Sequence, residues 1–356
     1  MPRKKKEESE SAKLSGADLV EQRIKDTFGE NILVRANYIT DSRDIVVPVS
    51  PMLDGILNGG IPFGSFVLAT GPPKIGKTSM FLDFGATALQ VPSEFGEDRR
   101  MYYLSIEGRL KERDMEGIHH LKPYIGTEKF SIVRSEKGKI LDAEEFLNIA
   151  EDIINNVPGA IVILDSFSSL CSTSGKTKEW DGKEYRDNVP KMLSLFCKRI
   201  SNVIPVNKSI VMGVTHQIAN TGFGFSSWAE ASGTKVQYQV DTKLKASHNT
   251  AWKDGDATIG IDVYWECLCS PLHNGPLADT KCISKFRFGY GIDKAAELIN
   301  VAVDLGIIKK GGAWYEFPDG TKYQGLEKAT LSMRENEELY NSINKEYREM
   351  MGLSCM

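Results

Sequence analysis

The sequence predicts an α/β fold in which helices flank a mostly parallel, twisted sheet. Short apolar runs with strand character alternate with helical patterns from Ile45 to the neighbourhood of Ser247. A glycine-rich loop lies between one such run and a helix, and carboxylates follow two of the runs. Alternating strand and helix patterns are typical of parallel sheets, which bind ligands at the carboxyl ends of their strands.

The individual elements follow from the spacing of apolar residues. The expected strands are Ser65–Thr70, Met101–Ile106, Phe130–Arg134, Ala160–Leu164, Ser209–Thr215 and Thr242–Ser247. The expected helices between them are Thr78–Gln90, Ala143–Asn155 and Asn188–Val203. Strand-like segments continue over Asp262–Tyr290, and further helices are expected at Ile292–Leu305 and Glu335–Met351.

A small element precedes the sheet. Asp18–Phe28 has apolar residues at helical spacing, and Ile32–Tyr38 has the pattern of a strand. It is either an oligomerisation arm or a helix that packs on its own domain, and the sequence favours neither. The expected division is an N-terminal tail and arm at 1–44, a core at 45–317 and a small C-terminal helical region at 318–356.

The composition is that of an ordinary globular protein, with 41% apolar and 26% charged residues and a net charge of −4. Any contact with nucleic acid is therefore expected from local basic or backbone-rich surfaces. No run of about eighteen apolar residues is present, which argues against a membrane span. The scattered cysteines fit a reducing cytoplasm, and Cys267, Cys269 and Cys282 are expected to be buried thiols in preference to metal ligands.

The glycine-rich loop reads G-P-P-K-I-G-K-T-S and matches the phosphate-loop pattern. Its glycines let the backbone N–H groups converge on phosphates, Lys77 adds a positive charge, and the Thr78 hydroxyl can ligate Mg²⁺. The following helix directs its positive N-terminal dipole at the same place. The expected nucleotide-binding residues are Gly71, Pro72, Pro73, Lys74, Ile75, Gly76, Lys77, Thr78 and Ser79. A strand before the loop and a helix after it identify a nucleoside triphosphatase.

Polar residues follow three of the predicted strands. Asp165 either orients a water on Mg²⁺ or starts a turn, and the upstream phosphate loop favours the metal role. Glu107 either orients the attacking water or is a surface residue beside a glycine. Gln217 is the stronger candidate to sense the γ-phosphate, and the adjacent His216 is either a second candidate or a core histidine.

Two long polar connections, Ser172–Arg186 and Ala219–Gly233, interrupt the alternation. The second carries aromatic residues between glycines and serines. Aromatic side chains can stack on bases and glycine permits close approach to phosphates, whereas the alternative is a lid that packs on the domain.

Taken together, these motifs resemble the RecA-type strand-exchange recombinases, especially the phage UvsX-like branch. The resemblance extends from Ile45 to Glu316, with a weaker tail to Met351. Its more specific part is the ordered set of motifs, which ends in G-Y-G-I-D, A-E-L-I-N-V-A-V-D-L-G-I-I and G-G-A-W-Y. The resemblance implies a RecA-like phosphate-loop core that uses ATP and Mg²⁺. It also implies a helical filament on single-stranded DNA that pairs with double-stranded DNA in recombination and repair.

The resemblance also implies individual roles. Lys77 and Thr78 would serve the phosphates and Mg²⁺, and Asp165 the metal-bound water. Glu107 would orient the attacking water, and Gln217 would sense the γ-phosphate. The two polar connections would be the DNA-binding loops, and the N-terminal arm would dock on a neighbouring subunit. The DNA-binding residues in and beside these loops would be Lys176, Lys178, Arg186, Asn220, Gly222, Phe223, Phe225, Gly233 and Lys235. Mediator and single-strand-binding proteins would be further partners, without a membrane, in the cytoplasm of a bacterial host if the protein is phage-encoded.

One departure from the family pattern concerns activation across the subunit interface. The family places paired lysines after its second DNA-binding loop, but the corresponding stretch Ser270–Pro276 has none, although Lys281 and Lys285 lie nearby. Two alternatives to a recombinase remain open. One is a ring helicase with the same core, which needs an arginine finger that cannot be assigned to Arg287. The other is a RecA-like regulatory ATPase that does not bind DNA.

Overall fold

The structure is a computed structural model that describes residues 15–35, 45–178, 187–220, 227–230, 234–273 and 280–353. Its contacts divide the chain into two units, residues 1–44 and 45–356. In the first unit, helix α1 (Gly16–Phe28) confirms the predicted helix, and Ser15 and Asp18 cap it reciprocally. The described part of the predicted strand, Ile32–Arg35, is not a strand, so that expectation was wrong there. A β pattern forms a strand only where a partner strand satisfies its backbone groups.

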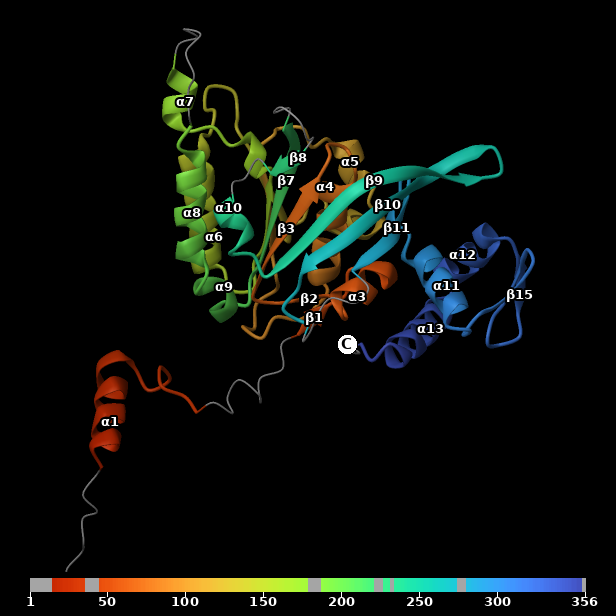
Figure 1. The fold of residues 1–356 in the computed structure, drawn as a ribbon, viewed down its shortest axis with the longest axis horizontal. Coiled ribbons are helices and arrows are strands. Elements are labelled where there is room, and N and C mark those ends of the chain that lie inside the picture. Colours follow the sequence, from red (N-terminus) through yellow and green to blue (C-terminus); the bar gives the residue numbers. More distant parts are fainter. Residues whose placement is uncertain are drawn as a thin grey trace, which may run out of the picture. The chain divides into compact units, whose positions relative to one another are not determined.

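The second unit is built on a 10-stranded sheet (Figure 1). All six predicted strands are present in it and run parallel to one another. In spatial order they are β9 (Thr242–Asp254), β3 (Ser65–Gly71), β7 (Ile210–Asn220), β6 (Ile161–Asp165), β4 (Met101–Ser105) and β5 (Phe130–Val133). The α/β class with a mostly parallel sheet is therefore confirmed.

An antiparallel extension continues the sheet beyond β9. Its strands are β10 (Ala257–Cys269), β11 (Lys281–Arg287) and β12 (Gly291–Ile292). The predicted strand Thr242–Ser247 was too short, because β9 continues as one arm of a long hairpin with β10. Only Thr242–Lys245 pair with β3, so most of this hairpin extends past the central strands (Figure 1).

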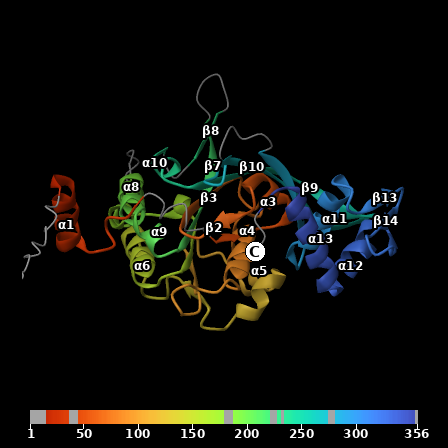
Figure 2. The ribbon, with the colours of Figure 1, turned by 90° about the horizontal axis from the view of Figure 1, so that it is seen from below.

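Helices cover both faces of the sheet. Successive side chains of a strand point to opposite faces, so Val67 and Ala69 of β3 lie in one hydrophobic cluster and Phe66 and Leu68 in another. The first cluster includes α4 (Lys77–Ala88), and the second includes α6 (Ala143–Asn156) and α8 (Val189–Ile200). Figure 2 shows α6 and α8 on one side of β3 and β7 and α4 on the other.

The remaining described elements of the core are short. They are β1 (Val46–Val47), α3 (Pro51–Leu57), β2 (Ile61–Pro62), α5 (Glu112–Glu116), η1 (His119–Tyr124), η2 (Phe167–Ser169), α7 (Thr173–Thr177), α9 (Val203–Val206), β8 (Ser227–Glu230) and α10 (Thr234–Gln237). The described helices include none with the length and apolar character that a bilayer crossing requires.

Both predicted polar connections contain regular structure, which corrects their description as loops. Helix α7 forms inside Ser172–Arg186, because the Ser172 hydroxyl accepts a hydrogen bond from Gly175 N and caps the helix. Strand β7 continues to Asn220, where β8 pairs with it antiparallel. The sequence analysis did not predict these short elements, because the segments that contain them are polar and rich in glycine. The candidate residues Arg186, Gly222, Phe223, Phe225 and Gly233 lie outside the described part of the chain.

The C-terminal region has its own hydrophobic cluster, which runs from Ala295 to Leu353 and so includes residues on both sides of position 317. Its elements are α11 (Lys294–Asp304), β13 (Lys309–Gly311), β14 (Trp314–Glu316), β15 (Lys322–Gln324), α12 (Leu326–Glu335) and α13 (Glu337–Met350). It is thus not purely helical, because β13, β14 and β15 form an antiparallel sheet. A buried ion pair with 2.8 Å between Arg348 and Asp54 joins α13 to α3 of the core.

Candidate nucleotide-binding site

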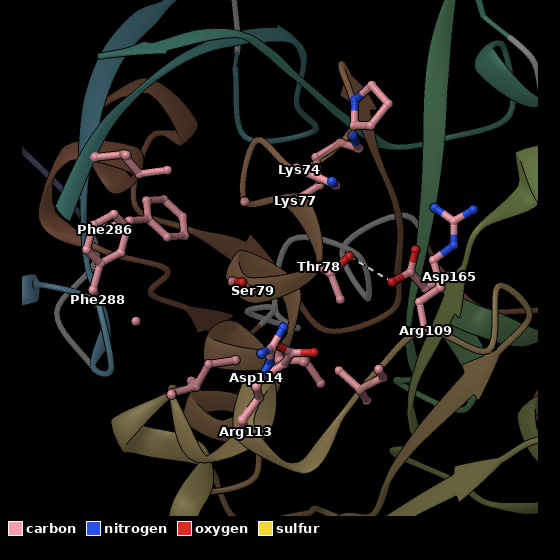
Figure 3. A pocket seen from close by; sticks show the side chains of 18 of the residues that line it. Lys74, Lys77, Thr78, Ser79, Arg109, Arg113, Asp114, Asp165, Phe286 and Phe288 are labelled. Atoms are coloured by element: carbon pink, nitrogen blue, oxygen red, sulfur yellow. Dashed lines mark hydrogen bonds and ion pairs between the residues drawn. The ribbon is translucent and has the colours of Figure 1, made fainter. Parts of the chain in front are cut away.

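A pocket of about 700 Å³ lies at the carboxyl edge of the parallel strands. Its lining comes from the start of α4, from the ends of β4 and β6, from His216 within β7, from residues in and around α5, and from the segment around the end of β11. In Figure 3, Asp165 and Arg109 lie on one side of the phosphate loop and Phe286 and Phe288 on the other. The pocket therefore has a charged end and an apolar end, as a nucleotide requires.

The phosphate loop connects β3 directly to α4. Gly71 has φ +148°, and a Cβ there would lie 2.3 Å from Ala246 O, so no other residue fits. Gly76 has φ +104° and precedes the first residue of α4. The loop residues that line the pocket are Pro73, Lys74, Gly76, Lys77, Thr78 and Ser79. The other three candidates do not line the pocket. Ile75 is buried in the core, and the carbonyl oxygens of Gly71 and Pro72 accept hydrogen bonds from Lys77 Nζ.

Lys77 is held at the base of the loop. Its Nζ donates hydrogen bonds to Gly71 O at 2.9 Å and to Pro72 O at 2.6 Å, and only 3% of the residue is exposed. Burial disfavours the ammonium form and lowers the pKa of Lys77 to about 8, although the carboxylates of Asp165 and Glu107 oppose the shift. A buried cation at this position is suited to an anionic ligand.

Thr78 and Asp165 lie side by side, as the dashed line in Figure 3 shows. The Thr78 hydroxyl donates to Asp165 Oδ2 at 2.7 Å, and the Tyr103 hydroxyl donates to the same oxygen at 2.7 Å. Burial raises the pKa of Asp165, while these two hydrogen bonds favour its charged form. A hydroxyl and a carboxylate are hard oxygen donors, so this pair fits Mg²⁺.

Glu107 lies just past the end of β4 and faces the same pocket. Its Oε1 is 2.6 Å from His216 Nε2 and accepts a hydrogen bond from Ser166 Oγ at 2.7 Å. The hydrogen bond from His216 contributes most to lowering the pKa of Glu107 to about 2, and the Ser166 hydroxyl and Arg109 add to the effect. Glu107 is therefore an ionised carboxylate near the phosphate loop.

The structure brings His216, and not Gln217, into the described lining of the pocket. His216 pairs in register with Gly71 of β3, and its backbone N donates to Ser168 Oγ at 2.8 Å. Within the described residues, its Nδ1 is buried without a hydrogen-bond partner. Consecutive strand residues face opposite ways, so only one of the two can face the pocket; the sequence analysis favoured Gln217, whereas the structure places His216 there.

Sequence reasoning assigned no role to the apolar end of the pocket. The Phe286 ring packs under the phosphate loop, 3.3 Å from where a Cβ on Gly76 would be. Phe288 lines the pocket although 62% of the residue is exposed, and Ile118 and Leu82 complete this wall. The only sequence feature that pointed to this part of the pocket was the motif G-Y-G-I-D, which directly follows Phe288.

Of the described DNA-binding candidates, Lys176, Lys178 and Asn220 lie near the carboxyl edge of the sheet. Lys176 of α7 donates to the backbone carbonyl of Leu141, and Thr173 to Asp142 Oδ2 at 2.5 Å, so α7 is docked at the start of α6. Lys178 directly follows α7. Asn220 ends β7 and Lys235 lies in α10. Figure 1 shows α7 and β8 at the same end of the sheet.

Two lysines that could reach a neighbouring molecule are engaged within the chain. Lys281 lies 3.8 Å from a carboxylate oxygen of Glu266. Lys285 Nζ is 2.9 Å from Asp262 Oδ1 and 4.6 Å from the centre of the Trp252 ring. The geometry therefore assigns neither lysine to a second nucleotide.

Comparisons with known proteins agree with this architecture. Residues 296–352 match the RecA C-terminal domain. Protein RecA of Bacillus subtilis is 23% identical over 350 residues, which cover 96% of this chain and 94% of that protein. Protein RecA of Saccharopolyspora erythraea is 24% identical over 345 residues (95% and 93%), and chromosomal RecA of Lactococcus lactis 25% over 337 residues (93% and 82%). The similarity spans the core and the C-terminal region, so it supports a RecA-type recombinase with a RecA-like core.

Proposed function

We propose that this protein is a DNA-dependent ATPase that forms helical filaments on single-stranded DNA and exchanges strands with homologous double-stranded DNA. The observation that carries the proposal is the convergence of Lys77, Thr78, Asp165 and Glu107 on one pocket, in a chain similar to RecA proteins over nearly all its length. Among RecA-type recombinases, we propose the phage UvsX-like branch, which the sequence motifs taken together resemble.

Each polar residue of the pocket has a distinct proposed role in hydrolysis. The loop N–H groups and Lys77 would bind the β- and γ-phosphates at the start of α4. Thr78 and Asp165 would hold Mg²⁺, which supplies neutralisation of the phosphate charge. Glu107 would accept a hydrogen bond from the attacking water and orient it toward the γ-phosphorus.

Strand β7 is the proposed link between ATP and DNA. It carries His216 in the lining of the pocket, with Gln217 next along the chain, and continues to Asn220, immediately before the glycine-rich segment proposed to bind DNA. Contact with the γ-phosphate at this strand would order that segment, and hydrolysis would release it. The sequence favours Gln217 as the sensor, whereas the contact with Glu107 favours His216.

The remaining features of the proposal come from the family resemblance. Residues 1–44 would form an arm that docks on a neighbouring subunit, and residues 318–356 would complete a C-terminal region. The first DNA-binding segment would contribute Lys176, Lys178 and Arg186. The second would contribute Asn220, Gly222, Phe223, Phe225, Gly233 and Lys235. Mediator and single-strand-binding proteins would assist assembly.

Electron microscopy tests the proposal directly. With single-stranded DNA and a non-hydrolysable ATP analogue, helical filaments are expected, and hydrolysis of ATP should increase when DNA is added. Closed rings would indicate a helicase instead. An ATPase that ignores DNA and forms no filaments would indicate a regulatory ATPase, and either result would contradict the proposal.

Substitutions separate the ATPase from the DNA-binding segment. Lys77→Ala should abolish hydrolysis. Phe223→Ala and Phe225→Ala should weaken binding to single-stranded DNA by about 1–3 kcal/mol per residue while basal hydrolysis is retained. Phe95→Ala is the matched control, because Phe95 is a 42% exposed aromatic residue in the loop before β4, at the amino edge of the sheet. Unchanged DNA affinity in both variants would remove the assignment of this segment.

A further inference from the structure

The apolar wall of the pocket is held from behind by the C-terminal helix α12. Arg287 lies between the two phenylalanines of this wall. Its Nε donates to Asp293 Oδ2 at 2.8 Å, and one terminal nitrogen donates to both carboxylate oxygens of Glu327 at 2.8 and 2.7 Å. Because Asp293 and Glu327 engage its donors within the chain, this guanidinium, which itself lines the pocket, anchors the wall.

A second contact comes from the same face of α12. Arg334 lies two helical turns after Glu327, and residues at that spacing lie on one side of a helix. It donates to Asp293 and sits 4.2 Å from the centre of the Tyr290 ring. Tyr290 belongs to the segment that forms the wall, between Gly289 and Gly291.

Tyr290 also connects α12 to the second part of the apolar wall, the segment that contains Ile118. Its ring stacks on His119 with 4.8 Å between ring centroids, and His119 N donates to Tyr290 O at 2.7 Å. His119 directly follows Ile118, which is buried and lines the pocket. Both apolar strips, at Ile118 and at residues 286–291, are therefore connected to α12.

The hairpin of β9 and β10 gives a third support to the same arginine. The Arg287 guanidinium lies 4.5 Å from the centre of the Trp252 ring, a cation–π contact in which the tryptophan is 6% exposed. Fixed between a ring and two carboxylates, Arg287 has little freedom to change rotamer. The position of Phe286 and Phe288 depends on it, because they are its chain neighbours.

We propose that α12 sets the affinity of the pocket for ATP, with Arg287 and Tyr290 as positioning residues for the apolar wall. Glu327 and Arg334 do not line the pocket, so they act through these two residues. The C-terminal region is then a functional part of the nucleotide site as well as a packing unit. The inference rests on the proposed function, since it takes ATP as the ligand.

Glu327 provides the sharpest test, because it is outside the pocket. In full-length Glu327→Ala and Glu327→Gln, binding of ATP with Mg²⁺ is measured by calorimetry without DNA, and hydrolysis is measured separately. Both the dissociation constant and KM should rise about fivefold, while kcat changes less than about twofold. Glu327→Asp, which keeps the charge, should restore part of the affinity.

A matched control and a double-mutant cycle distinguish positioning from general destabilisation. Glu316→Gln removes an ion pair with Lys322 (3.0 Å) in the same C-terminal region, and neither residue is among the described partners of Arg287, so this variant should leave ATP affinity unchanged. Arg287→Ala combined with Glu327→Ala should weaken binding by less than the sum of the single effects.

The outcomes separate the two levels of the proposal. If Glu327→Ala and Glu327→Gln bind ATP as tightly as the wild-type protein, α12 does not set the affinity and the inference is wrong. The inference is also wrong if Glu316→Gln weakens binding as much as they do. If the wild-type protein itself binds no ATP, the proposed function is wrong, and the inference is wrong with it.

Discussion

The imidazole Nε2 of His216 lies 2.6 Å from Glu107 Oε1, which links β7 to the residue just past the end of β4. Ser166 Oγ donates to the same oxygen, so the carboxylate proposed to orient the attacking water is already fixed in direction. A carboxylate with a pKa lowered to about 2 is a weak base. It is better suited to holding a water by a hydrogen bond than to removing a proton from it.

Loss of the imidazole should impair the chemical step more than binding. In His216→Ala, Glu107 loses its shortest hydrogen bond, and we expect kcat for ATP hydrolysis to fall by about a hundredfold while KM changes little. Steady-state kinetics with and without single-stranded DNA measure both constants. A rise in KM with kcat unchanged would show that His216 contributes to ATP binding and does not position Glu107.

The lowered pKa of Glu107 predicts a specific dependence of stability on pH. Since the folded-state pKa is about 2 and the ordinary value is 4.5, the unfolded chain binds more protons between them. The contribution of Glu107 to stability is therefore complete above pH 4.5 and is lost as the pH falls toward 2. Urea unfolding of wild type and Glu107→Gln at pH 5, 4 and 3 should show the difference between them shrinking with acidity. A difference that stays constant would contradict the shift.

The lowered pKa of Lys77 predicts a pH dependence in the alkaline range. Its pKa is lowered from 10.5 to about 8 by burial, so the nucleotide-free protein loses this charge as the pH rises through 8. Phosphates favour the charged form, and ATP affinity should therefore fall between pH 7 and pH 9. The unfolded chain holds the proton up to 10.5, so the same group makes the free protein more stable as the pH rises from 8 to 10.5. Calorimetry on wild type and Lys77→Met tests this, because the variant should lack both dependences.

The Thr78–Asp165 pair predicts how nucleotide binding responds to Mg²⁺. Asp165→Asn keeps the shape of the side chain but removes its charge, and should lower kcat by about a hundredfold and remove the increase in ATP affinity caused by Mg²⁺. Chelation of the metal should have the same effect on the wild-type protein. If Asp165→Asn retains the full response to Mg²⁺, another residue holds the metal.

The ion pair between Arg348 and Asp54 predicts that the C-terminal region depends on the core for stability. Both side chains are nearly buried, and Arg348 also donates to Gly59 O at 2.8 Å. Arg348→Ala leaves a buried carboxylate unpaired and should lower the free energy of unfolding by about 3–5 kcal/mol. The double variant with Asp54→Ala should be less destabilised than the sum of the single variants. Additive effects in denaturant unfolding would show that the two residues do not interact.

The sequence predicted the parts of this molecule that follow local rules. Strand runs such as Ile161–Asp165 are continuous and apolar, and the phosphate loop needs glycine where the backbone requires positive φ. It missed α7 because five polar residues form a helix only when Ser172 caps them, and it stopped β9 at Ser247 because the exposed hairpin beyond is polar.

The candidate site was predictable only where a residue follows a strand or belongs to a motif. Asp165 and Glu107 meet because neighbouring parallel strands end at one edge of the sheet. The choice between His216 and Gln217 depends on which face of β7 meets the pocket, and this is set by packing. Arg287 and Glu327 are 40 positions apart in the chain, so their contact is a property of the tertiary fold that no local pattern encodes.

Strand β7 has a further consequence for how quickly the two functional regions can communicate. An extended backbone is almost inextensible, and the four residue steps from His216 to Asn220 span about 13 Å. The strand pairs with β3 over Ile210–His216 and with β8 over Gln217–Asn220, so a partner strand holds it at both ends and a displacement at His216 is passed along a paired backbone. A change at the ATP site would then reach the proposed DNA-binding segment as a shift of the strand itself, without a folding step or a domain rotation.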